Sequence, residues 1–494
     1  MFGCIKNIIE KITALNHSVD TYKKDTIIQS LPSLAQVNRA KNLMVQKKYE
    51  EAEKVLLEAL SLPQKDPLVY KYLGAVYERL GKHELSVENY QLSADLNPND
   101  KIIWQRLGFA LMSCQKYEQA EKSFENADKI CPANTDNFSG WGMALMKQKK
   151  YSQAREKFLK AIEIDKYNFS AVFLCSVMEI RLEMYDKAEN KLIFLANVCP
   201  NESNAFEYAR LKALKDDYDS AILYAKKSLD YNPKMLPAYI LLGQIYAFKY
   251  DEENSLKSFE TAFEKGLLNA NLLLEWGKAL QKFGRYDEAK QKFLNALELE
   301  NDNMEILANL GLCCVLRKEF EQATPILSQV LEKEPQNSVV KQALGIINYE
   351  KNDIDTAISY LRNNDESPVN CYYLAKCYEK LNNDTKIRDY YEAAIRLNPS
   401  YTQAFVDYSQ YLISKKEFSQ AQRKLRKAVK FVENNSVLLN LLFYTSYILV
   451  KENLCEYNVK ETIAIVEKFN NPDLFEYPEQ KAELNQLLQD MKEK

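Results

Sequence analysis

The chain has 494 residues, of which 66 are basic and 69 acidic, and its formal net charge of -3 gives no overall positive field to attract nucleic acid. Hydrophobic residues make up 46% of the chain, which excludes a wholly disordered protein, and the small numbers of Gly (12) and Pro (14) favour long helices over turn-rich β structure. The ten cysteines form no C-x-x-C pair and there are only two histidines, so we expect no metal site and no cofactor.

Residues 1–32 are predicted to form an N-terminal amphipathic helix and a linker. Lys6, Glu10 and Lys11 interrupt its apolar residues, so the segment lacks the continuous apolar core of a signal peptide. The apolar residues recur at helical spacing: Phe2, Ile5, Ile8, Ile9, Ile12 and Leu15. A helix that caps the first repeat explains this pattern, and an anchor at a membrane interface is the alternative. No stretch of the chain approaches the roughly 20 apolar residues of a transmembrane helix.

From residue 33 onward the sequence repeats. One column of small residues recurs at a nearly constant interval, because its successive members differ in number by 34 nine times, by 33 once and by 30 once. It consists of Ala40, Gly74, Gly108, Gly142, Ser176, Ala209, Gly243, Gly277, Gly311, Gly345, Ala375 and Ser409. Seven of the twelve glycines fall in this column, so the position must be sterically restricted. We call it the first small column.

Two further small columns follow in each unit. The second begins at Ala52, with Ile387 as its exception, and the third begins at Ala59. Prolines such as Pro98 and Pro132 close half of the units. Two antiparallel helices approach within about 8 to 10 Å only where one presents a small residue. Each unit is therefore predicted to be a helix, a turn and a second helix, stabilised by stacking on its neighbours.

This pattern resembles the tetratricopeptide repeat family, whose signature is clearest in residues 137–166. The signature residues there are Trp141, Gly142, Tyr151, Ala154, Phe158 and Ala161. The resemblance covers about residues 33–433. It implies an all-α fold, a right-handed α-solenoid (superhelix) of about twelve helix-turn-helix repeats, with capping helices at the N- and C-terminal ends.

The unit between Gly345 and Ala375 is four residues short, and its second helix should end early near Asn364. The deletion would cause a local change of superhelix curvature, and the alternative is that it marks a hinge or a notch specific to a partner. Residues 434–494 are interpreted as a degenerate repeat, with helical patterning over 436–450 and 459–469, followed by an amphipathic segment from Pro478. That last segment is predicted to cap the solenoid, with dimerisation as the alternative.

No sequence motif indicates catalysis. The chain has no G-x-x-x-x-G-K-[ST], G-x-G-x-x-G or G-x-S-x-G motif, and His17 and His83 are interpreted as structural. We therefore expect a protein that is not an enzyme, without catalytic or metal-binding residues.

The resemblance implies that the first helix of each unit lines a concave groove that binds a peptide. One and five residues after the first small column, basic residues outnumber acidic ones, with Glu350 as the single acidic residue. The candidate groove residues are Lys147, Arg181, Arg210, Lys278, Lys282, Phe173, Val177, Phe206, Leu241 and Phe248. They suggest a protein or peptide partner with acidic and apolar side chains. Lysines that merely keep a helix soluble would give the same pattern.

The sequence thus predicts a cytoplasmic scaffold or adaptor that binds a partner polypeptide and not nucleic acid. The cytoplasm is expected because unpatterned cysteines fit a reducing compartment. The alternative is an accessory subunit of a larger enzyme or of a machine for envelope, secretion or glycan assembly. The sequence does not determine the oligomeric state.

Overall fold

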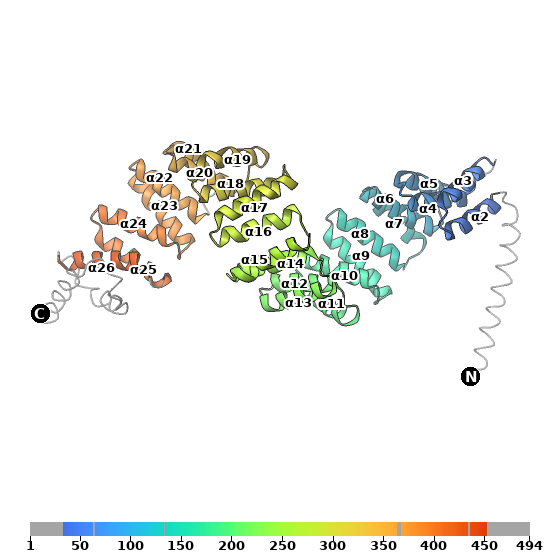
Figure 1. Cartoon of the computed structure of the whole chain (residues 1–494), viewed down its shortest axis with the longest axis horizontal. Coiled ribbons are helices and arrows are strands. Elements are labelled where there is room, and N and C mark those ends of the chain that lie inside the picture. The colour runs from blue at the N-terminus through green and yellow to red at the C-terminus, as the bar shows by residue number, and fades with distance from the viewer. Residues whose placement is uncertain (1–32, 63–64, 133, 363–366, 433–434, 452–494) are drawn as a thin grey trace, which may run out of the picture. The chain divides into compact units, whose positions relative to one another are not determined.

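A computed structural model describes residues 33–62, 65–132, 134–362, 367–432 and 435–451. Within these ranges the chain forms 25 α-helices, labelled α2 to α26, and no strand (Figure 1). The predicted all-α class is confirmed. The predicted N-terminal helix, the segment 459–469 and the cap from Pro478 lie outside the described residues.

The helices alternate along the chain between two kinds. The first kind carries the first small column: α2 (Leu34–Val45), α4 (Pro67–Arg79), α6 (Lys101–Ser113), α8 (Thr135–Lys147), α10 (Phe169–Arg181), α12 (Glu202–Leu214), α14 (Leu236–Phe248), α16 (Ala270–Lys282), α18 (Met304–Leu316), α20 (Ser338–Glu350), α22 (Pro368–Lys380) and α24 (Thr402–Ser414). The second kind follows each of these: α3 (Tyr49–Leu60), α5 (His83–Leu96), α7 (Tyr117–Ile130), α9 (Tyr151–Ile164), α11 (Tyr185–Val198), α13 (Tyr218–Tyr231), α15 (Glu252–Glu264), α17 (Tyr286–Leu299), α19 (Phe320–Lys333), α21 (Ile354–Leu361), α23 (Asp384–Leu397) and α25 (Phe418–Phe431). The last described helix is α26 (Ser436–Lys451).

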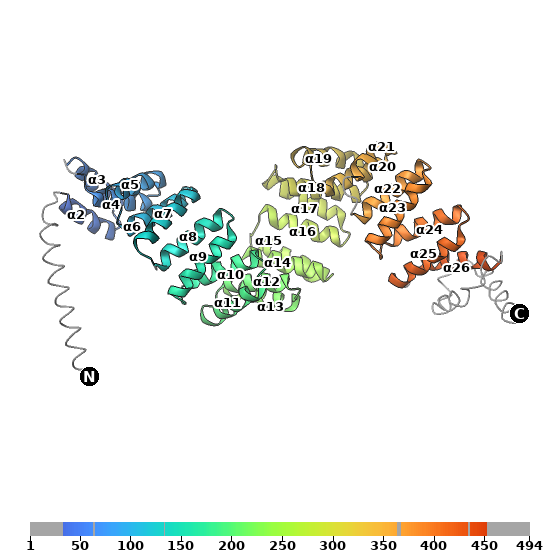
Figure 2. The same ribbon diagram turned by 180° about the vertical axis from the view of Figure 1, so that it is seen from behind.

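The chain divides into two compact units, Met1–Ile245 and Tyr246–Lys494, with the boundary inside α14. Within each unit a first helix packs on the second helix that follows it, as α4 does on α5 and α16 on α17. First helices also contact the next first helix, for example α6 with α8 and α18 with α20 (Figure 2). This stacking of helical hairpins is the predicted α-solenoid. The repeat count of twelve and the boundaries at residues 32 and 433 stay predictions.

Helical hairpins are closed by a turn of constant geometry. The residue seven places after the first small column has a positive φ in every hairpin, as at Lys47 (60°) and Gly284 (78°). The amide N–H of Lys47 donates to the carbonyl of Met44 (3.0 Å), and that of Lys48 to the carbonyl of Leu43 (2.9 Å). These two bonds are those of a Schellman turn. The residues with positive φ are Lys47, Gly81, Gln115, Lys149, Glu183, Asp216, Tyr250, Gly284, Lys318, Asn352, Asn382 and Lys416.

The first small column lies where the two helices of a hairpin cross. A Cβ atom added to Gly142 would lie 2.6 Å from Cε1 of Phe158, and one added to Gly277 would lie 2.5 Å from Cε1 of Phe293. Both rings are completely buried. The obstructing side chain follows its glycine at the same interval in both hairpins. The predicted steric restriction is confirmed, and its cause is a specific buried side chain on the second helix.

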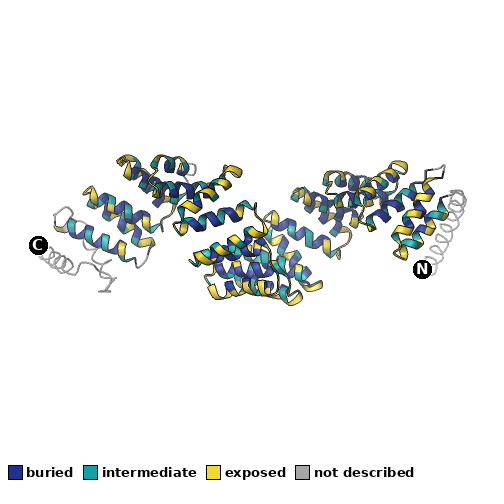
Figure 3. Cartoon of the chain, turned by 45° about the horizontal axis from the view of Figure 1, so that its top comes forward, coloured by how far each residue is buried: buried dark blue, intermediate teal, exposed yellow. Residues whose placement is uncertain are grey.

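The two other small columns are also buried. Their alanines and serines are at most 3% exposed wherever the structure describes them, and Ile387 is buried at 1% although it is larger than its column. Figure 3 shows buried residues along the faces where helices pack and exposed residues on the faces that point away. The core of each unit is therefore a continuous layer between helices.

Two hairpins share a close contact between a lysine and a buried tryptophan. The Nζ atom of Lys157 lies 3.1 Å from the ring centre of Trp141, and that of Lys292 lies 3.3 Å from the ring centre of Trp276. Burial lowers the pKa of both lysines. Each lysine covers the face of an indole at the surface of a hairpin.

The predicted short helix is confirmed. Helix α21 has 8 residues, whereas the neighbouring second helices α19 and α23 have 14. Asn364, where a hinge was predicted as an alternative, lies outside the described residues. None of the helices described is long and apolar enough to cross a membrane.

Candidate functional site

The first helices carry a row of exposed side chains in constant register. Each helix buries the small column and exposes the residue five places later, near its C-terminal end. This exposed row consists of Val45, Arg79, Ser113, Lys147, Arg181, Leu214, Phe248, Lys282, Leu316, Glu350, Lys380 and Ser414. Because neighbouring first helices contact one another, successive members of the row within one unit lie on adjacent helices.

In the first unit three of the six members of the exposed row are basic, namely Arg79, Lys147 and Arg181. Lys147 ends α8 and Arg181 ends α10, so both also lie at the negative end of a helix dipole. Both side chains are exposed, and neither forms a hydrogen bond or an ion pair with the residues that the structure describes. These two predicted groove residues are available to an acidic partner.

Two other predicted cations are already paired. Arg210 contacts Glu207 (Nη2 to Oε2, 2.6 Å), and Lys278 contacts both Glu275 (2.8 Å) and Glu305 (2.6 Å). Burial disfavours the charge of Lys278, but hydrogen bonds to the two carboxylates outweigh it and raise its pKa. These acidic partners neutralise part of the basic bias that the sequence showed.

The signal for this pairing was present in the sequence. Glu207 and Glu275 stand two places before the small column, three residues before Arg210 and Lys278, which is a spacing that places side chains together on a helix. Lys376 likewise contacts Glu379 (3.1 Å) and Asp407 (3.3 Å). The sequence interpretation considered only the positions one and five residues after the first small column. It therefore missed the carboxylates at other positions of the helices, such as Glu207 and Glu275.

The apolar candidates of the first unit serve mainly as packing residues. Phe173 packs against the buried cluster of Leu192 and Tyr208, and Val177 packs against the cluster around Phe158. Phe206 and Leu241 are half-buried.

The second unit begins with exposed aromatic residues. Phe248 is 57% exposed and Tyr250 is 73% exposed. The Nζ atom of Lys282 lies 5.1 Å from the ring centre of Phe248 and 4.4 Å from that of Tyr250. Tyr250 occupies the turn position with a φ of 57°, which is unfavourable for a bulky side chain. The sequence interpretation included Phe248 and Lys282 but missed Tyr250.

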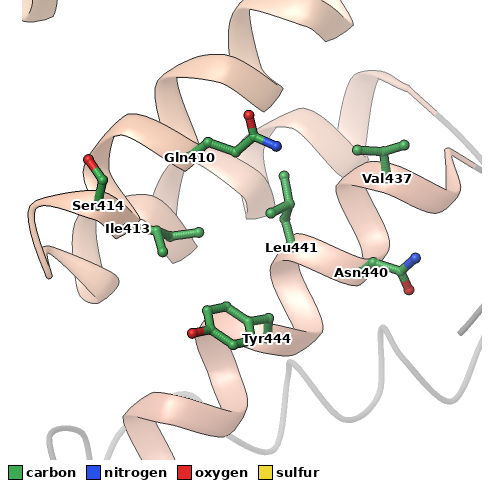
Figure 4. A pocket seen from close by; sticks show the side chains of 7 residues that line it. All are labelled: Gln410, Ile413, Ser414, Val437, Asn440, Leu441 and Tyr444. Carbon is green, nitrogen blue, oxygen red and sulfur yellow. The ribbon is translucent and has the colours of Figure 1, made fainter. Parts of the chain in front are cut away.

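A pocket of about 400 Å³ lies between α24 and α26. Gln410 and Ile413 of α24 face Leu441 and Tyr444 of α26 across it (Figure 4). The Oδ1 atom of Asn440, which also lines the pocket, is buried and has no hydrogen-bond donor among the described residues. A second pocket of about 350 Å³ is lined by Lys376, Glu379 and Asp407 with residues of α23 and α24. No candidate residue had been placed at this end of the chain.

The described residues include no group of three or more His, Cys, Asp or Glu side chains that could hold a metal ion. The cysteines of these parts of the chain are free thiols. Burial raises the pKa of Cys175 and of Cys377 to about 12, which keeps both thiols protonated at neutral pH.

Known proteins resemble the chain at low sequence identity. The BBSome complex member BBS4 of Bos taurus is 21% identical over 290 residues, which are 58% of this chain and 54% of that protein. The human N-alpha-acetyltransferase 16, NatA auxiliary subunit, is 28% identical over 169 residues, or 33% of this chain and 19% of that protein. The matched part of the chain thus spans about half or less of the length of these relatives.

Among solved structures, yeast Tom70 is 20% identical with a TM-score of 0.41, over 88% of this chain and 98% of that one. The Cut9 and Hcn1 hetero-tetramer of the APC/C is 13% identical with a TM-score of 0.43, over 85% of this chain and 97% of that one.

Sequence models of one repeat family match three parts of the chain. A model described as "Tetratricopeptide repeat" matches residues 280–347, another with the same description matches 370–401, and "Psidin, N-terminal TPR repeats region" matches 45–198. These matches lie in both units, on the hairpins whose crossings carry the small columns. The chain belongs to the tetratricopeptide repeat family.

Proposed function

We propose that this protein is a scaffold that binds a partner polypeptide along the exposed row of its first helices. The observation that carries the proposal is the constant register of that row, which repeats one exposed side chain per hairpin on helices that touch one another. An extended peptide that crosses successive first helices would meet one member of the row per hairpin.

Two parts of this surface favour different partner chemistry. Lys147 and Arg181 of the row favour acidic side chains in the first unit, and Phe248 of the row with Tyr250 in the following turn favours apolar side chains at the start of the second unit. An exposed ion pair contributes at most about 1 kcal/mol, so affinity has to come from several hairpins together.

Site-specific photo-crosslinking tests this proposal in the full chain. A photoreactive residue replaces Lys147 or Arg181 in one set, and Lys187 or Lys226 in a control set. The control residues are exposed lysines on the second helices α11 and α13. We expect a crosslinked polypeptide from the row positions and not from the control positions.

The captured polypeptide then allows an affinity measurement by titration. Reversing the charge of Lys147 and Arg181 together should weaken its binding by roughly tenfold, since each exposed pair contributes up to about 1 kcal/mol. Reversing the charges of Lys187 and Lys226 together should leave the affinity unchanged. Crosslinks that come equally from both sets, or equal losses of affinity, would count against the proposal.

A second function is favoured by the relatives. Two of the similar proteins are described as a member of a complex and as an auxiliary subunit of an acetyltransferase. We therefore also propose that the chain is a non-catalytic subunit of a larger assembly in the cytoplasm. Sedimentation of the endogenous protein tests this: a stable complex of several hundred kilodaltons supports it, and a free monomer argues against it.

A further inference from the structure

Helix α25 differs from the other second helices in its charge. It contains five basic residues, Arg423, Lys424, Arg426, Lys427 and Lys430, and no acidic residue. The other second helices from α3 to α23 each contain at least one Asp or Glu. A chain with a slight net negative charge thus concentrates cations on one helix near the end of its described part.

The cations on the outer side of α25 are exposed and unpaired. Arg423, Lys427 and Lys430 are exposed and form no ion pair with any described residue, and the same holds for Lys416 in the preceding turn. The first three are separated by four and three residues, a spacing that places them on one face of the helix. At about 1.5 Å per residue, these three cations span roughly 10 Å of the helix.

The opposite face of α25 is firmly packed. Ala421, Leu425 and Ala428 are completely buried, and the side chain of Gln422 donates a hydrogen bond of 2.9 Å to Ser446 of α26. The helix is therefore fixed along its length. Lys424 forms an ion pair with Glu392 of α23, whereas Arg423, Lys427 and Lys430 are exposed.

An exposed aromatic side chain lies at the end of this basic face. Phe431, the last residue of α25, is 50% exposed. An aromatic side chain beside several cations is the combination that favours the interface between lipid headgroups and hydrocarbon.

We propose that this basic face of α25, formed by Arg423, Lys427, Lys430 and Phe431, binds the surface of an anionic lipid membrane. A lipid surface carries charge of one sign, so an acidic residue anywhere on the face would be repelled, and α25 has none. A protein partner offers both signs and would tolerate mixed charges. The two pockets at this end of the unit, which would suit a peptide, are lined by other helices and turns, chiefly α22, α24 and α26.

Co-sedimentation of the full chain with vesicles tests the proposal. The vesicles contain phosphatidylcholine alone or phosphatidylcholine with a minority of phosphatidylserine. We expect binding to the anionic vesicles only, and release as salt rises to about 0.5 M, where the Debye length falls below about 5 Å. The variant R423Q/K427Q/K430Q should bind roughly 100-fold more weakly, because each cation near the surface contributes about a fivefold factor.

A matched control removes the same charge elsewhere. K187Q/K226Q/K257Q neutralises three exposed lysines on α11, α13 and α15, which also carry acidic residues. This variant should bind like the unchanged protein. All substituted positions are exposed, and equal thermal unfolding of the variants will show that folding is unaffected.

Several results would overturn the proposal. Equal binding to neutral and anionic vesicles, or equal losses in the two triple variants, would show that α25 is not the binding surface. Tighter binding to duplex DNA than to anionic vesicles would assign the face to nucleic acid. Residues 452–494 contain ten acidic and five basic residues, so carbodiimide crosslinks from Lys427 to them, without vesicle binding, would assign the face to the chain's own end.

Discussion

The crossing between α16 and α17 makes a specific prediction for Gly277→Ala. The added Cβ atom would lie 2.5 Å from Cε1, 2.8 Å from Cδ1 and 2.9 Å from Cζ of Phe293, a ring that is completely buried. Inserting a methyl group into such a site typically costs about 1 to 3 kcal/mol, and three such close contacts favour the upper end. Alanine regains about 1 kcal/mol of helix propensity over glycine. The free energy of unfolding should therefore fall by about 2 kcal/mol.

Urea unfolding of the full chain, followed by circular dichroism, measures this loss, and hydrogen exchange locates it. We expect a lower midpoint and faster exchange in α16 and α17. Ser176→Ala is the control, because it changes the same column without adding a carbon atom. Its effect should be small. A rise in the midpoint for Gly277→Ala, as helix propensity alone would give, would refute the steric explanation of the column.

A second substitution tests whether the ring is the obstacle. Leucine obstructs this column as closely as a ring does, since a Cβ atom added to Gly311 would lie 2.5 Å from Leu327, whereas Ala209 is followed at the same interval by the small Ala225. Phe293→Ala should therefore cost about 1 to 2 kcal/mol less in the Gly277→Ala background than in the unchanged protein, a coupling expected for residues in contact. Additive effects would show that Phe293 is not the side chain that obstructs the added methyl group.

Three further predictions concern the turns, a buried carboxylate and the thiols. Glu183→Gly should raise the unfolding temperature by stabilising the turn by about 1 kcal/mol, because φ there is 59°; Gly284→Ala should lower it, and a shift in the same direction for both would contradict the turn argument. Glu179→Gln should destabilise the fold by about 3 kcal/mol in urea unfolding, because the fully buried carboxylate contacts Arg155 and Lys191, both at 2.9 Å. An unchanged midpoint would mean that these two ion pairs contribute nothing to stability. Burial raises the pKa of Cys175 from 9.0 to about 12, so the neutral thiol stabilises the fold fully below pH 9 and this contribution is lost as pH rises toward 12. Mass spectrometry should accordingly show that iodoacetamide modifies Cys131 before Cys175 in the folded protein at pH 8, and equal rates would contradict the burial.

The sequence predicted those parts of the fold that depend on residue size. The columns marked by Gly142 and Ala154 lie on helices that pack as expected, and the shortened α21 follows from the missing residues after Gly345. The large side chain that obstructs each of these glycines was not recognised as a column, because its members vary among Tyr90, Phe124 and Leu327. A column of mixed large residues is harder to see than one of small residues.

The candidate site was less predictable because charge depends on neighbours in space. The sequence marks both Lys278 and Lys147 as groove cations, yet Glu305 on the next first helix neutralises Lys278, whereas Lys147 stays without such a partner in the part of the chain described. Tyr250 was missed for another reason. It lies in the turn seven places after the first small column, where ten of the twelve residues are not glycine and no residue type occupies most of the positions, so residue identity did not mark the position.

The stacking of lysine on tryptophan also determines how unfolding can be observed. The chain has three tryptophans, with Trp104 and Trp141 in the first unit and Trp276 in the second. Trp276 is 7% exposed and its ring face is covered by Lys292, so its emission should shift to longer wavelength only when the second unit opens. A protein with Phe at positions 104 and 141 would therefore carry a single tryptophan, and its emission, excited beyond the absorption band of the 32 tyrosines, would report the opening of the second unit without an added label.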